Sequence, residues 1–120
     1  MRNTFFLLLL LSCGLGCKPK TSTPTPLPVE QLPAALEKAF SEAPAEAKEL
    51  AGQVIAFIKA QDYSKAHPQM RALAATPNLT PEQLNVTARG LLTLNGLLQS
   101  AEAQGDQTAA QALQNYRVTK

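Results

Sequence analysis

From Leu32 to Tyr116, apolar side chains recur at intervals of three and four residues. This interval is the spacing of one face of an α-helix. The composition agrees, because alanine is abundant, tryptophan is absent and aromatic residues make up 5% of the chain; alanine has the highest helix propensity of any residue. The pattern predicts an all-α domain over residues 30–117, a small bundle of four to five helices, with a frayed tail over residues 118–120.

Prolines and capping residues mark the expected ends of these helices. The apolar stripes predict helices over residues 32–43, 45–60, 63–75, 82–104 and 108–116. Pro44 should end the first helix, because proline cannot donate a backbone hydrogen bond. Asp62 is the expected N-cap of the third. Pro68 either bends that third helix or marks its true start.

The clearest helix start lies at residues 80–83. Thr80 is a good N-cap, Pro81 suits the first helical position, and Gln83 stands where a capping box needs its second side chain. The helix that follows ends at a predicted stop and fresh cap, Gly105 and Asp106.

Apolar residues spread over more than half the circumference of the predicted 82–104 helix. So wide a face implies contact with more than one neighbour, and exposed apolar surface usually marks an interaction site. We expect an interaction face at Leu91, Leu94, Leu97 and Leu98. The pair Asn95-Gly96 leaves open whether this helix is continuous.

The first seventeen residues follow another pattern. Arg2 supplies positive charge, residues 5–11 are all apolar, and small residues precede Cys17. This order is typical of a secretory signal, and the apolar part is shorter than the ~20 residues of a membrane-spanning helix. We expect residues 1–16 to be removed.

The end of that segment resembles the lipobox of bacterial prolipoproteins, in which a small residue precedes a cysteine that is acylated and becomes the mature N-terminus. Cys17, after Gly16, is the favoured lipid site because it leaves the longer apolar segment. Cys13 is the alternative, since it has the family's leucine, Leu10, three residues before it. A disulfide between the two cysteines also stays open.

The resemblance implies a protein anchored in the membrane through an N-terminal lipid at the bacterial cell envelope. Lys18 follows the anchor cysteine instead of aspartate, which by the sorting rule of enteric bacteria implies the outer membrane, facing the periplasm. Residues 17–29 then form the lipidated cysteine and a disordered linker rich in proline and threonine. In polyproline II geometry this linker would span roughly 30–40 Å.

Residues 50–77 resemble one unit of the tetratricopeptide repeat, a helix-turn-helix of about 34 residues. Leu50 and Phe57 match its large residues, Tyr63 the tyrosine of the second helix, and Ala66 its small residue. Pro68, inside the second helix, departs from the pattern. The resemblance implies helical hairpins that bind a peptide or protein segment.

Other chemistry has little support in the sequence. His67 is the only histidine and precedes a proline, so we expect it on an exposed turn and predict no metal site. No nucleophile motif or phosphate loop predicts an enzyme or a cofactor. Without Arg2 the side chains carry 10 positive and 9 negative charges, a balance that does not favour nucleic acid.

The sequence therefore predicts a lipid-anchored envelope protein that presents a small helical module to a protein or peptide partner. The alternative is a structural lipoprotein that assembles with itself and has no separate ligand.

Overall fold

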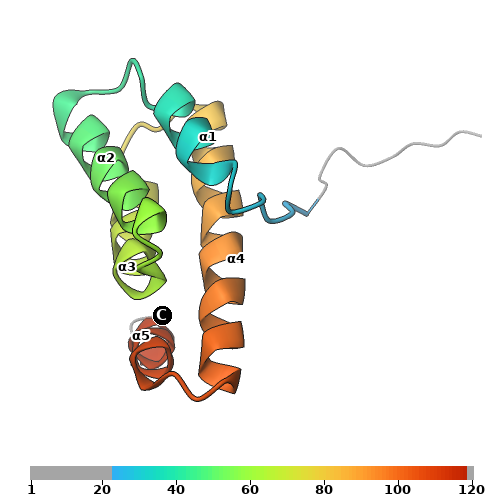
Figure 1. Cartoon of the computed structure of the whole chain (residues 1–120). Coiled ribbons are helices and arrows are strands. Elements are labelled where there is room, and N and C mark those ends of the chain that lie inside the picture. The colour runs from blue at the N-terminus through green and yellow to red at the C-terminus, as the bar shows by residue number, and fades with distance from the viewer. Residues whose placement is uncertain (1–22, 119–120) are drawn as a thin grey trace, which may run out of the picture.

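The computed structural model describes residues 23–118, which contain five α-helices and no strand (Figure 1). The helices are α1 (Leu32–Ala39), α2 (Ala45–Lys59), α3 (Tyr63–Ala74), α4 (Pro81–Ala103) and α5 (Gln107–Val118). This architecture confirms the all-α class and the small helical bundle. Cys13 and Cys17 lie outside the described residues.

Three helices begin at the caps that the sequence predicts. The Asp62 carboxylate accepts a hydrogen bond from the Lys65 amide at the start of α3. Thr80 and Gln83 form the reciprocal capping box of α4, with distances of 3.1 Å and 2.9 Å. At α5, Asp106 Oδ1 accepts the amides of Thr108 and Ala109. Each cap satisfies amides that have no partner within the helix.

The first helix is shorter than expected. It ends at Ala39, and residues 40–43 form a turn in which the Ala43 amide donates to the Phe40 carbonyl at 3.2 Å. Pro44 has no amide hydrogen to donate to the Phe40 carbonyl, one turn earlier, and it disfavours the helical conformation at Ala43, so the helix does not continue through residues 40–43. Phe40 still enters the core and is 1% exposed.

The remaining helices are continuous where the sequence left their continuity open. The α4 helix passes through Asn95 and Gly96 without a break, and α3 passes through Pro68. Pro68 has no amide hydrogen, so the carbonyl of Ser64, one turn earlier, lacks its usual helical donor.

The main core lies between α1, α2, α3 and α4 (Figure 1). Leu32, Val54, Met70 and Leu94 are each 0% exposed within it. At the crossing of α4 over α1 and α3 stands Gly90, where an added Cβ would come within 2.6 Å of Met70 and 3.1 Å of Leu32. A larger residue at this position would require the ends of the Met70 and Leu32 side chains to shift.

The last helix packs on a second, smaller apolar cluster formed by Leu98, Ala109 and Leu113. It contacts α3 and α4 and turns back from the end of α4 (Figure 1). Tyr63 is half-buried and touches both clusters, so it connects α5 to the main core.

Residues 23–29 lie along α4 and do not form a free spacer. Arg89 Nε donates to the Thr25 carbonyl at 2.8 Å, and Thr93 Oγ1 donates to the Leu27 carbonyl at 2.6 Å. The side chains of Leu27 and Val29 pack on the main core. The expectation of a linker through residue 29 is thus corrected, because its last seven residues belong to the folded body.

Candidate functional site

The predicted interaction face on α4 is mostly covered. Leu94 and Leu98 are 0% and 2% exposed, the first in the main core and the second beneath α5. Leu91 and Leu97 are half-buried against the main core. The expectation that these four leucines form a partner site is therefore wrong for Leu94 and Leu98. The wide apolar face of α4 packs instead against two neighbours, the main core and α5.

The single histidine is also placed differently from the expectation. His67 is 2% exposed, inside α3, whereas the sequence predicted an exposed turn. Because α3 continues through Pro68, residue 67 falls on the inner stripe with Tyr63 and Met70, and α5 then covers it. His67 lies four residues after Tyr63 and three before Met70, and this helical spacing is the sequence signal that indicates a buried position.

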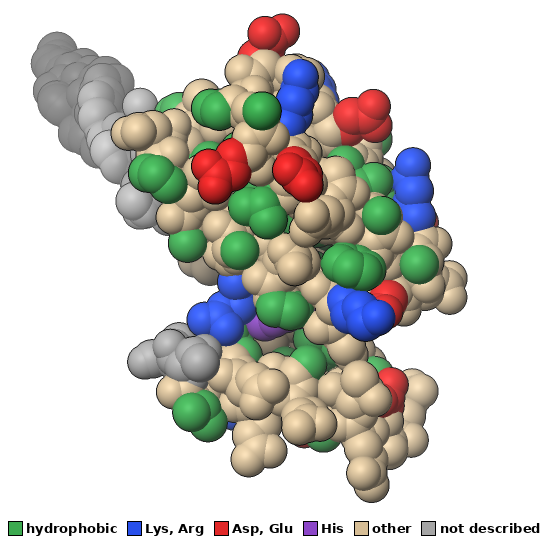
Figure 2. All heavy atoms as spheres, turned by 90° about the vertical axis from the view of Figure 1, so that its left-hand side faces the viewer, with side chains coloured by type: hydrophobic (Ala, Val, Ile, Leu, Met, Phe, Trp, Pro, Cys, Tyr) green, Lys and Arg blue, Asp and Glu red, His purple; other side chains and the backbone are tan. Residues whose placement is uncertain are grey.

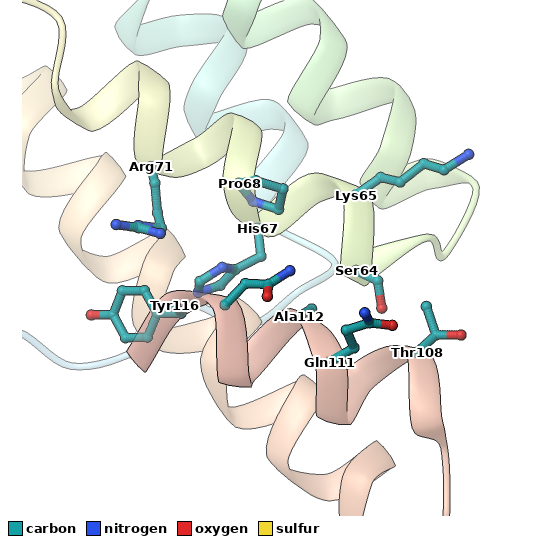
Figure 3. Close-up of a pocket in the computed structure, with 10 residues that line it drawn as sticks. Ser64, Lys65, His67, Pro68, Arg71, Thr108, Gln111, Ala112 and Tyr116 are labelled. Atoms are coloured by element: carbon teal, nitrogen blue, oxygen red, sulfur yellow. The ribbon is translucent and has the colours of Figure 1, made fainter. Parts of the chain in front are cut away.

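A cleft between α3 and α5 is formed around this histidine. Its volume is about 290 Å³, and it opens on the side of the molecule turned away from α4 (Figure 2). Both helices contribute side chains that point toward it (Figure 3). The lining residues are Ser64, Lys65, His67, Pro68, Arg71, Thr108, Gln111, Ala112, Asn115 and Tyr116.

Tyr116 joins the two helices at one end of the cleft. Its ring stands edge-on to the imidazole of His67, with centroids 5.1 Å apart and planes at 87°. The guanidinium carbon of Arg71 lies 4.6 Å from the centre of the same ring. Edge-on aromatic pairs and cations over a ring face both match the charge distribution of the ring. These contacts hold α5 against α3 where its apolar cluster is small.

The electrostatics of the cleft keep the histidine neutral. Burial lowers the pKa of His67 from its ordinary value of 6.5, and the nearby charge of Arg71 lowers that pKa further. At neutral pH the imidazole therefore offers one donor and one acceptor. Two lining residues, Lys65 and Arg71, carry positive charge and none of the lining residues is acidic, although Lys65 also lies 3.7 Å from the Asp62 carboxylate.

The arrangement is suited to recognition. It combines an aromatic ring, a guanidinium, and the hydroxyl and amide groups of Thr108 and Gln111 around one recess. Within residues 23–118, no group of three or more His, Cys, Asp or Glu side chains is placed to hold a metal ion. None of the five helices has both the length and the apolar character needed to cross a bilayer.

A scan against protein-family models, a search of curated proteins and a search of solved structures each found no match to this chain.

Proposed function

We propose that this protein is a bacterial lipoprotein, anchored through Cys17, that presents its helical body to a protein or peptide partner in the cell envelope. The lipobox-like end of the signal segment supports the anchor. The lysine after Cys17 supports an outer-membrane location facing the periplasm.

The observation that carries the binding role is the cleft between α3 and α5. It is the place where aromatic, cationic and amide side chains from two helices converge on one recess, through Arg71, Gln111 and Tyr116. Tyrosine and arginine are enriched where proteins bind each other. A peptide segment that carries a carboxylate or a backbone carbonyl fits donors of this kind.

The anchor is tested by labelling cells with a clickable fatty acid. The wild-type protein should take up the label, and Cys17→Ser should not, because the acceptor sulfur is gone. Cys13→Ser is the matched control and should remain labelled. Loss of the label in Cys13→Ser alone would move the anchor to Cys13, and an unlabelled wild type would contradict the lipoprotein assignment.

The binding role is tested with a photo-crosslinking amino acid at Gln111, which is exposed at the cleft. In native membranes it should give a discrete adduct with one partner, and Tyr116→Ala should weaken that adduct. The same crosslinker at Glu49, on the exposed side of α2, is the control and should give none. An adduct of twice the mass of the protein would instead favour the self-assembling alternative.

A further inference from the structure

The outer face of α4 carries a stripe of exposed apolar side chains. Leu84 is 51% exposed and Leu92 is 40% exposed, and Ala88 lies exposed between them on the same stripe. The two leucines are eight residues apart, which is about 12 Å along the helix axis. Between Glu82 and Glu102, Arg89 is the only charged residue.

The opposite side of the molecule has the ordinary character of a solvated surface. Acidic and basic side chains are scattered over its upper part in Figure 2, above the cleft, whereas the lower part, formed by α5, shows few. The α2 helix alone carries Glu46, Lys48, Glu49 and Lys59 within fifteen residues. The stretch between Glu82 and Glu102 on α4 is thus poorer in charge than α2, although residues 107–116 of α5 also carry no charged side chain.

The route of the N-terminal segment brings that same face close to the anchor. Thr23 and Thr25 share a shallow groove with Leu84, Ala88 and Arg89. Residues 23–29 also lie on the side of α4 that faces away from α2, α3 and α5 (Figure 1).

The length of chain from the anchor to this face is short. Only six residue steps separate Cys17 from Thr23, and a fully extended chain covers at most about 22 Å in six steps. The docking of residues 23–29 therefore replaces the 30–40 Å spacer with a much shorter tether that begins at the α4 face.

We infer that the α4 face marked by Leu84, Ala88 and Leu92 lies on the surface of the bilayer that holds the lipid anchor. This inference rests on the proposed anchor at Cys17. In this orientation the two leucines enter the headgroup region, and the cleft between α3 and α5 opens away from the membrane. Exposed leucines beside a cation, Arg89, are side chains of the kind that a helix presents to the headgroup region.

The bilayer is favoured over a protein partner by proximity and charge. Two exposed leucines bind a bilayer weakly when free in solution, but a short tether keeps them at high effective concentration beside it. Arg89 on the face, and Lys18 and Lys20 in the tether, are attracted to anionic headgroups. The acidic residues Glu82 and Glu102 stand at the two ends of this stretch.

The test uses tryptophan fluorescence, because the chain contains no tryptophan of its own. Residues 17–120 are coupled through the Cys17 thiol to a maleimide phospholipid in vesicles of phosphatidylethanolamine and phosphatidylglycerol that also contain a headgroup-level quencher lipid. Ala88→Trp reports on the α4 face, and Ala56→Trp, an exposed alanine on α2, is the matched control. The emission of the first should be strongly quenched and that of the second should not.

A second variant shows whether the leucines cause the contact. Leu84→Asp with Leu92→Asp, made in the Ala88→Trp background, should abolish the quenching while the circular dichroism spectrum stays helical. Equal quenching at both positions, or none at either, would overturn the inference. A spectral shift at position 88 that grows with protein concentration without lipid would also overturn it, since a second copy would then cover the face.

Chemical coupling separates this result from the proposed function. The lipid is attached at Cys17 whether or not cells acylate that residue, so the quenching reports only on the orientation of the body. Failure of the fatty-acid label would count against the lipoprotein assignment, and failure of the quenching would count against the bilayer contact alone.

Discussion

Gln83 shows how one side chain can serve a local and a long-range role. Its Oε1 accepts the Thr80 amide to close the capping box, while its Nε2 donates to the Ala39 carbonyl at 3.0 Å, at the end of α1. The side chain is 7% exposed. The start of α4 is thereby tied to the end of α1, and the cap predicted from the sequence also contributes to the tertiary structure.

Substituting Thr80 by alanine should lower the free energy of unfolding by about 1 kcal/mol, because the Gln83 amide loses its acceptor. Urea denaturation followed by circular dichroism measures this change. Ser100→Ala, at an exposed position inside α4, is the control and should be neutral or slightly stabilising. An unchanged midpoint for Thr80→Ala would contradict the role of the capping box.

Two turns end their helices with the same hydrogen bonds but different residues. After α2, the Asp62 amide donates to the Phe57 carbonyl, and Gln61 adopts a φ of 59°. After α4, the Asp106 amide donates to the Ala101 carbonyl, and Gly105 adopts a φ of 93°. This left-handed conformation favours glycine and is strained for glutamine.

Gln61→Gly should therefore raise the free energy of unfolding by roughly 0.5–1 kcal/mol, and Gly105→Ala should lower it by about 1 kcal/mol. Each substitution is a control for the other, because the first removes a Cβ from a left-handed position and the second adds one. Thermal melts of both variants provide the measurement. A stability loss in Gln61→Gly would mean that the glutamine side chain contributes more than its strained backbone costs.

At the scale of the element, α5 is held by the smaller of the two apolar clusters. Its apolar support consists of the cluster of Leu98, Ala109 and Leu113, which is much smaller than the main core. Further contacts come from Tyr63, which packs against this cluster, from Tyr116 against His67 and Arg71, and from an exposed ion pair of Arg117 with Glu102 at 3.9 Å. An exposed pair of this kind contributes little.

The stability of the protein should fall as the pH drops below 6.5. Because the pKa of His67 is lower in the folded state, the unfolded chain takes up the proton first and unfolding is favoured. Above 6.5 both states are neutral and this contribution does not change. The free energy of unfolding keeps falling until the pH is below the folded-state pKa of His67, and it then levels off.

Urea denaturation between about pH 7.5 and 5.5, with NMR titration of the single imidazole, measures this effect. His67→Gln, which cannot titrate in that window, should have a flatter pH dependence than the wild type. A histidine signal that titrates at its ordinary value would contradict the burial of His67 beneath α5.

At the scale of the whole molecule, the α4 face and the side that holds the cleft between α3 and α5 differ in the side chains that they expose. The α4 face carries exposed leucines and adjoins residues 23–29, whereas the cleft between α3 and α5 has polar lining residues and opens on the side turned away from α4 (Figure 2). A body of this size buries only a modest core, yet its five helices cover Leu94 and Leu98 without help from a partner.

The chain of residues 18–120, without an anchor, should therefore be a monomer in solution. The buried state of Leu94 and Leu98 removes the reason to expect that the wide face drives assembly. Sedimentation velocity at several concentrations tests this. A discrete oligomer that Leu92→Asp dissociates would favour the structural alternative over the binding module.

The sequence by itself determined the helical class and most helix starts, because those signals are local. Asp62, Thr80 and Asp106 cap amides that lie two or three residues away, so no knowledge of the fold was needed to find them. The end of α1 differs from the expectation, since the apolar pattern continues to Ala43 whereas the helix ends at Ala39.

Only the tertiary structure decided which surfaces remain open. The hydrogen bonds from Thr93 to Leu27 and from Gln83 to Ala39 join residues 66 and 44 positions apart, and periodicity does not predict such pairs. Periodicity shows that α4 has a wide apolar face, because that pattern is local. It does not show that α5 covers Leu98 and leaves Leu92 exposed, because that depends on long-range packing. The position of His67 likewise depends on α5, whose docking site is set by the packing of the other helices.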